Sequence, residues 1–181
     1  MSTNQEIKTA LERSVRTLKL KPARGRVTRK ATARLVDGVK CEVKERDWTL
    51  TSDVNPMLGG HESAPSPSTF GRMALGSCLA MDYAMWFSRL DVPYDGIEVE
   101  VEADMDFSGF LGVDDSVPPG HKEMRVRVNV SSSAPQAEIE RAIELADRYS
   151  AMLYMFTQPI PVKRQLNLPV PTAATAKAVS H

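Results

Sequence analysis

The sequence has few of the residues that build disulfide frameworks or metal centres. Only two of its 181 residues are cysteines, Cys41 and Cys78, and only three are histidines. Two cysteines cannot form the framework of a small secreted protein, and the cysteines and histidines show none of the usual spacings of a metal site. Glycines such as Gly59 and Gly60 follow neither the P-loop nor the dinucleotide-binding pattern. We therefore expect no metal and no cofactor.

Neither sign of charge is in excess. The chain has 23 Lys and Arg against 23 Asp and Glu, so its formal net charge is zero. A protein that binds nucleic acid or an acidic membrane needs a basic surplus, so neither is expected as a partner. No apolar run reaches membrane-spanning length, and no apolar signal segment stands near the first residue. With two unpaired cysteines, this predicts a protein of the reducing cytoplasm.

The apolar residues that are present predict three helices. Residues 4–20 carry them on one face with charges opposite, which is typical of a short amphipathic helix. Residues 66–90 are apolar on nearly every side, so we expect a helix buried on every side, with a second copy of the chain covering what one sheet leaves open. Residues 133–156 predict a further helix, capped by the Ser133 hydroxyl and by Gln136 in a capping box.

Alternation of apolar and polar residues predicts the strands. The pattern over residues 39–43 indicates a half-buried strand that turns the side chain of Cys41 inward. Residues 97–102 and 124–130 alternate strictly, and antiparallel pairing would set glutamates against arginines on the wet face and valines together on the dry face. A last strand is expected at residues 162–168.

The order of these elements predicts an α+β fold. We expect three parts: an amphipathic helix and linker at residues 1–25, the domain itself at 26–168, and a disordered tail of small residues at 169–181. The Gly- and Pro-rich segment between the two alternating strands is expected to be a surface loop. His121, at the end of that segment, is expected at the surface.

The segment LGGHESAPSPSTFGRMALGSCLAMDYAMW, residues 58–86, carries a resemblance to a known family. A loop of GG-x-PSP type leads into an apolar helix with an A-L-G-x-C-like motif, and this order is similar to that of the OsmC/Ohr family, the osmotically inducible and organic-hydroperoxide-resistance proteins. The resemblance extends over residues 26–168. It implies an intertwined homodimer in which antiparallel sheets wrap two long central helices. It also implies thiol peroxidase chemistry on small organic hydroperoxides, with Cys78 as the oxidised residue.

The sequence departs from the family at two positions. Ser150 stands where the family has its resolving cysteine on the second helix, and a hydroxyl cannot form the disulfide. Ser68 stands where the family has a glutamate. Arg34, shortly before a hairpin turn, is the nearest candidate for the family's catalytic arginine, which lowers the pKa of the thiol. Three outcomes stay open: Cys41 resolves the oxidised sulfur, an external thiol reductant resolves it, or peroxide reduction has been lost.

Two other functions stand beside that of a one-cysteine peroxidase. His61 is a candidate base for Cys78 in a thiol-dependent hydrolase or acyl-transfer enzyme, with Glu62 orienting its ring. The chain could instead be a non-catalytic binder of a small apolar ligand at the dimer interface. The alternative to each of these functions is a purely structural role for Cys78, because unpaired cysteine is among the most buried residue types.

The remaining candidate site residues lie on the two long helices. Asp82, one turn after Cys78, shares its helix face and opposes ionisation of the thiol unless a cation offsets it. The residues expected around the substrate are Met81, Asp82, Ser150 and Tyr154.

Overall fold

The computed structural model describes residues 3–168, so the tail expected at 169–181 lies outside the described residues. The fold is α+β with two antiparallel sheets, as predicted. One sheet has three strands in the order β1-β2-β3, and the other pairs β4 with β5. The strands are β1 (Thr32–Asp37), β2 (Lys40–Glu45), β3 (Trp48–Ser52), β4 (Gly96–Met105) and β5 (His121–Ser131). The helices are α1 (Asn4–Leu20), α2 (Pro67–Arg89), α3 (Phe107–Phe110), α4 (Gln136–Tyr149) and α5 (Ala151–Thr157).

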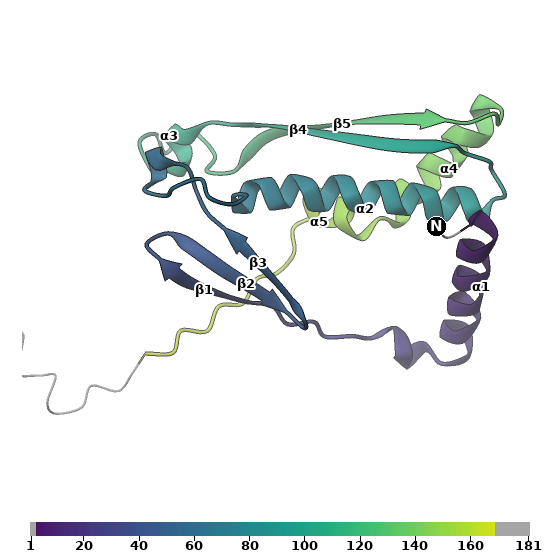
Figure 1. Cartoon of the computed structure of the whole chain (residues 1–181), viewed down its shortest axis with the longest axis horizontal. Coiled ribbons are helices and arrows are strands. Elements are labelled where there is room, and N and C mark those ends of the chain that lie inside the picture. Colours follow the sequence, from purple (N-terminus) through teal and green to yellow (C-terminus); the bar gives the residue numbers. More distant parts are fainter. Residues whose placement is uncertain (1–2, 169–181) are drawn as a thin grey trace, which may run out of the picture.

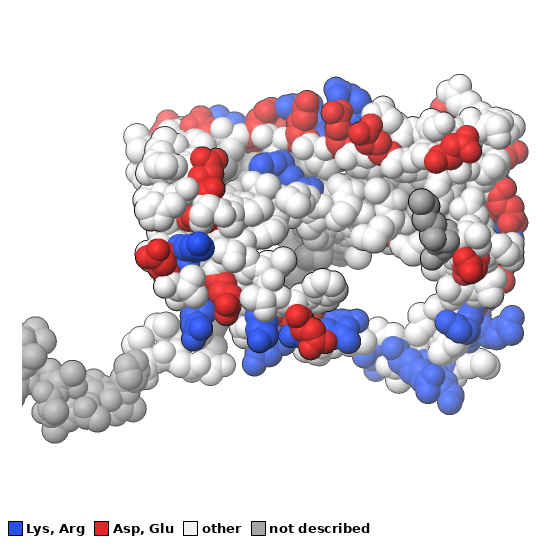
Figure 2. Space-filling model, in the orientation of Figure 1, with Lys and Arg blue, Asp and Glu red and all other residues white. Residues whose placement is uncertain are grey.

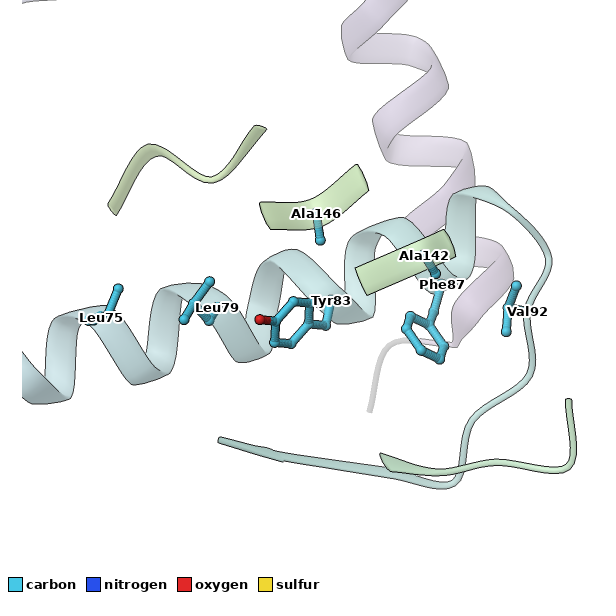
Figure 3. Close-up of a cluster of buried hydrophobic side chains, with 7 residues drawn as sticks. All are labelled: Leu75, Leu79, Tyr83, Phe87, Val92, Ala142 and Ala146. Atoms are coloured by element: carbon cyan, nitrogen blue, oxygen red, sulfur yellow. The ribbon is translucent and has the colours of Figure 1, made fainter. Parts of the chain in front are cut away.

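Helix α2 is the centre of the molecule (Figure 1). It starts as its sequence predicts, because the hydroxyl of Ser66 accepts a hydrogen bond from the backbone of Thr69 and Pro67 occupies the first turn. Every fourth residue is then buried against the β4–β5 sheet and α4, which gives one continuous core (Figure 3). The buried residues are Leu75, Leu79, Tyr83, Phe87, Val92, Ala142 and Ala146.

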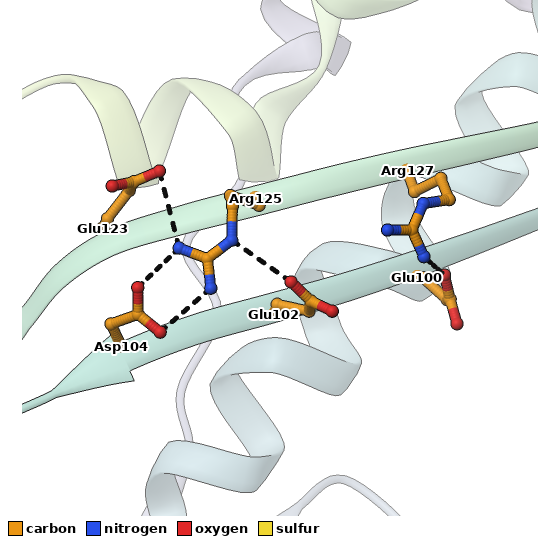
Figure 4. Close-up of polar contacts among 6 residues, drawn as sticks. All are labelled: Glu100, Glu102, Asp104, Glu123, Arg125 and Arg127. Carbon is orange, nitrogen blue, oxygen red and sulfur yellow. Dashed lines mark hydrogen bonds and ion pairs between the residues drawn. The ribbon is translucent and has the colours of Figure 1, made fainter.

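The β4–β5 pair has the predicted register. Glu100 lies opposite Arg127 and Glu102 opposite Arg125, while valines pair on the face toward α2. Arg125 also donates to Asp104 and bonds the Glu102 carboxylate at 3.1 Å (Figure 4). These hydrogen bonds lower the pKa of Asp104 and raise that of Arg125. Because the network is exposed, it fixes the register of the two strands more than it adds stability.

One chain leaves much apolar surface uncovered. Helix α2 buries a single face, and Met73 and Met81 on the remaining surface are 56% and 59% exposed. In the three-stranded sheet Leu35 and Trp48 are 66% and 75% exposed. Figure 2 shows an opening between the linker that follows α1 and the body of the molecule. The single chain thus leaves part of α2 open, and the expectation that a second copy covers it stays a prediction.

The C-terminal half differs from the sequence prediction in three ways. The helix expected at 133–156 breaks at Ser150, where the chain turns from α4 into α5. The expected cap from Ser133 is wrong, since α4 begins after Pro135 without a side-chain cap. Residues 162–168 form no strand.

Among residues 3–168 no helix is both long and apolar enough to cross a membrane.

Candidate functional site

Cys78 lies in the fourth turn of α2 and is half-buried. Its thiol is free, and Sγ donates to Oδ2 of Asp82 at 3.5 Å, across one helical turn. Among the described residues, no Lys, Arg or His side chain hydrogen-bonds to the sulfur or to Asp82. The described part of the chain therefore places no cation at this thiol.

A second half-buried acid, Asp147, lies close to this stretch of α2. The hydroxyl of Tyr83 donates to Oδ1 of Asp147 on α4 at 2.8 Å. Burial raises the pKa of Asp147, the hydrogen bond from Tyr83 lowers it, and the charge of Asp82 raises it again. Burial and the same two carboxylates raise the pKa of Tyr83, so the tyrosine stays a donor. This pair anchors α4 to the helix that carries Cys78.

Tyr83→Phe should destabilise the protein by about 1–2 kcal/mol at neutral pH, because Asp147 then stays charged and half-buried without its donor. Burial already holds the pKa of Asp147 above its ordinary value, so its charge disfavours the fold as pH rises. The difference in melting temperature from the parent should therefore be larger at pH 7 than at pH 3, because a carboxyl group whose pKa lies above 3.8 is protonated at the lower pH. Thermal unfolding followed by circular dichroism at both pH values measures this. Tyr149→Phe, which removes an exposed hydroxyl, is the matched control. An equal difference at both pH values would contradict the prediction.

The remaining predicted site residues do not converge on Cys78 within the described chain. Arg34 lies on β1 opposite Glu42, in the exposed three-stranded sheet. Cys41 lies on the neighbouring strand, half-buried, and forms no disulfide. His61 and Glu62 are exposed in the loop before α2. Their backbone N–H groups donate to Asp53 and to the Val54 carbonyl, and neither side chain forms a hydrogen bond among the described residues. The catalytic roles expected for Arg34, His61 and Glu62 and the resolving role considered for Cys41 stay predictions.

The residues expected around the substrate differ in exposure. Met81 and Tyr154 are exposed, and Asp82 is half-buried. Ser150 is only 2% exposed, and its hydroxyl accepts a hydrogen bond from the backbone of Leu153. Ser150 is therefore the N-cap of α5, a structural role that the sequence did not predict.

Asp53, which the sequence analysis missed, organises the loop that leads into α2. Its side chain accepts hydrogen bonds from the backbone of Val54, His61 and Ser63 and from the Ser63 hydroxyl. The backbone and hydroxyl of Ser63 lower the pKa of Asp53 to about 2. Gly60 is required inside this turn, since a Cβ there would lie 2.0 Å from the Val54 carbonyl oxygen. Only the Gly-Gly pair indicated a tight turn.

Asp53→Asn should lower the melting temperature at pH 7 by about 5 °C or more, because the amide replaces one acceptor oxygen with a donor that faces other donors. With a lowered pKa, the native carboxylate stabilises the fold fully above its ordinary pKa of 3.8 and loses this effect as pH falls toward about 2. The difference between parent and variant should therefore narrow between pH 5 and about 2. Asp115→Asn, an exposed carboxylate in the loop after α3, is the matched control. A difference that stays constant over this range would contradict the assignment.

A cavity of about 360 Å³ lies at the start of α2, and Cys78 does not line it. Its polar wall contains Ser68, whose Oγ is 2.9 Å from Nη1 of Arg72 and 3.2 Å from Nε2 of His121. The expectation that His121 is a surface residue is wrong: strand β5 begins with it and turns its ring onto the first turn of α2. The helix α3, in the segment expected to be an irregular loop, supplies an apolar wall. No sequence pattern links residues this far apart, although Arg72 is the one cation in the first 22 residues of the apolar helix.

The chain is similar to known proteins both in sequence and in structure. The profile of the family described as OsmC-like protein matches residues 60–164. The chain is similar in structure to an OsmC-like protein from Mycoplasma pneumoniae, with a TM-score of 0.63 and 12% identity over 72% of this chain and 87% of that chain. It is also similar to an organic hydroperoxide resistance protein, OsmC, from Legionella pneumophila, with a TM-score of 0.54 and 15% identity over 72% of this chain and 90% of that chain. No curated protein matches the sequence.

Proposed function

Since the chain belongs to the OsmC-like protein family, we propose that it is a one-cysteine thiol peroxidase that reduces organic hydroperoxides through Cys78. The observation that carries this proposal is the free, half-buried thiol of Cys78 on the central helix, at the family's motif position. The name of the Legionella relative, organic hydroperoxide resistance protein, supports the same substrate class. The two free cysteines fit the reducing cytoplasm that such a cycle needs.

The proposed cycle uses two equivalents of an external thiol. The Cys78 thiolate attacks the terminal oxygen of ROOH and the O–O bond breaks, which leaves the Cys78 sulfenic acid and an alkoxide. The alkoxide takes up the proton that the thiol released to solvent and leaves as the alcohol ROH. A first external thiol then attacks the sulfenic sulfur and forms a mixed disulfide with loss of water. A second external thiol regenerates the Cys78 thiol and leaves as the external disulfide. No second cysteine of the chain is required, which suits Ser150 at the family's resolving position.

A homodimer would supply what the single chain lacks at Cys78. Asp82 accepts the hydrogen bond of the thiol, and the described chain places no cation at the sulfur. Large apolar residues of α2 and of the three-stranded sheet are exposed, and contiguous exposed apolar residues commonly mark a protein interface. We therefore assign Arg34, on that exposed sheet, as the cation that a second copy brings to Cys78. Its guanidinium would offset Asp82 and lower the pKa of the thiol.

Trapping of the sulfenic acid tests the proposed function. The protein is mixed with cumene hydroperoxide and dimedone, and the adduct is located by peptide mass mapping. Cys78 should acquire the adduct at a rate about 10²-fold or more above that of free cysteine, and Cys41 should not. Equal rates at Cys78 and free cysteine would overturn the proposal. Arg34→Gln should slow the reaction, with Arg29→Gln in the linker as control.

The hydrolase alternative has a separate outcome. The structure gives no hydrogen bond between His61 and Cys78, so no observation favours that pair. An acyl adduct on Cys78 after an activated ester, weakened by His61→Ala, would replace the peroxidase with a thiol hydrolase.

A further inference from the structure

The cavity at the start of α2 is a second place where the chain can hold a small molecule. It is bounded by the loop after β3, the first turns of α2, the end of β4, helix α3 and His121. Its volume, about 360 Å³, falls in the range of ligand sites, about 300–1,000 Å³. Cys78 does not line this cavity, so a ligand can bind here whether or not Cys78 reduces peroxides.

Arg72 supplies a positive charge that no carboxylate neutralises. Its two terminal nitrogens donate to the hydroxyls of Ser68, at 2.9 Å, and Thr69, at 3.3 Å. Among residues 3–168 it takes part in no ion pair, whereas Arg125 and Arg127 on the outer face of β5 are both paired with acids. A half-buried guanidinium bonded only to neutral oxygens still has donors and charge to offer an anion. The N-terminus of the 23-residue helix α2 adds to the positive potential here.

His121 lies in the wall of the same cavity and bonds the polar group beside Arg72. Because Ser68 Oγ accepts from Arg72, its own proton points to Nε2 of His121, 3.2 Å away. The ring of His121 therefore holds Ser68 next to the guanidinium, and Ser68 offers Arg72 no negative charge.

The rest of the cavity is apolar. Phe107 and Phe110 of α3 both line it, with ring centroids 6.3 Å apart in an edge-to-face arrangement, and they are 37% and 49% exposed. Leu58 and Met105 complete this wall. An apolar tail placed here would cover the two aromatic rings, which favours binding.

We propose that this cavity binds a small amphipathic carboxylate, with its charged group at Arg72 and its apolar tail against Phe107 and Phe110. An inorganic anion would leave the aromatic wall uncovered, and a neutral apolar molecule would leave the guanidinium of Arg72 without a negative partner. Both ends of the cavity are satisfied only by a ligand that has both features.

Octanoate binding to the full-length protein tests the proposal. Methionine methyl groups are labelled with ¹³C, and the Met105 signal is identified by its loss in Met105→Leu. Octanoate should shift the Met105 signal saturably, with a Kd on the order of 10–100 µM, while Met73 and Met81, which do not line the cavity, stay in place. Octan-1-ol and acetate should each bind at least about tenfold more weakly, because each lacks one of the two features.

Two variants separate charge from shape. Arg72→Gln should weaken octanoate binding at least about tenfold and octan-1-ol binding little, whereas Arg141→Gln, an exposed arginine on α4, should change neither. Ala103→Leu, which fills the cavity without altering charge, should block both ligands and keeps the test valid if Arg72→Gln fails to fold. Equal affinities for octanoate and octan-1-ol, no saturable shift of Met105, or unchanged binding by Ala103→Leu would each overturn the proposal. Cys78→Ser should bind octanoate normally, which keeps this result separate from the peroxidase activity.

Discussion

Cys78→Ser should reduce the turnover of cumene hydroperoxide by about 10³-fold or more, to the uncatalysed rate, while Cys41→Ser stays within about twofold of the parent. The serine hydroxyl ionises only at far higher pH than a thiol, and its oxygen cannot take up the peroxide oxygen, so both halves of the proposed cycle are lost. Cys41 lies on β2 in the three-stranded sheet, and neither cysteine is in a disulfide. The measurement is peroxide consumption with dithiothreitol in excess, on variants whose circular dichroism matches the parent.

The paired variants also decide between the ways of resolving the sulfenic acid. If Cys41→Ser stops turnover but still forms the dimedone adduct at Cys78, Cys41 is the resolving thiol and no external thiol is needed at that step. If both variants retain turnover, the peroxidase proposal is wrong and Cys78 is a structural residue of α2. The chain has only these two cysteines, so the pair of variants covers every thiol.

Helices and strands with a clear hydrophobic period were predictable, because that period is visible in the residues of the element itself. The helix at residues 4–20 and the pairing of β4 with β5, glutamate against arginine, follow from spacing alone. Helix α2 starts at its Ser-Pro signal for the same reason. Local sequence patterns predict the structure of one element or one pair of strands, and these elements form as their patterns predict.

The break at Ser150 depends on packing that no local rule contains. Residues 133–156 have helical period throughout, but the chain turns at Ser150, whose hydroxyl is buried and starts α5. A serine inside a helical pattern is compatible with either a continuous helix or a new N-cap, and tertiary contacts of α4 and α5 with α2 decide between them.

Much of the site could not be predicted from the sequence, because its side-chain contacts join residues that are far apart along the chain. Ser68 and His121 are 53 residues apart, and neither belongs to a motif that predicts the other. Asp53 reaches Ser63 across a loop whose only sequence signal was Gly59-Gly60. Cys78, by contrast, was found from a contiguous motif, and its bond to Asp82 follows from the spacing of one helical turn. Pairs within one element are predictable, and pairs between elements require the fold.

Ser150→Cys should convert the one-cysteine cycle into a two-cysteine cycle. The position is 2% exposed at the junction of α4 and α5, and α5 packs against α2, the helix of Cys78. If this chain retains the family's arrangement, the new thiol attacks the Cys78 sulfenic acid, water leaves, and an intramolecular disulfide forms. Turnover supported by a dithiol should then rise at least about tenfold over the parent, because an intramolecular thiol competes at high effective concentration. Non-reducing mass mapping after one equivalent of hydroperoxide identifies the bridge.

Ser150→Ala is the control that isolates the thiol, since both substitutions remove the hydroxyl that caps α5. Each should cost about 0.5–2 kcal/mol in stability through the lost cap, so equal melting temperatures are expected for the two variants. Only Ser150→Cys should gain turnover, and adding Cys78→Ser to it should abolish the gain. A disulfide requires Cα atoms no more than about 7 Å apart, so peroxide treatment that yields no bridge would show that position 150 and Cys78 lie farther apart than in a working two-cysteine site. In that case the proposed cycle depends on the external thiol even when the second cysteine is restored.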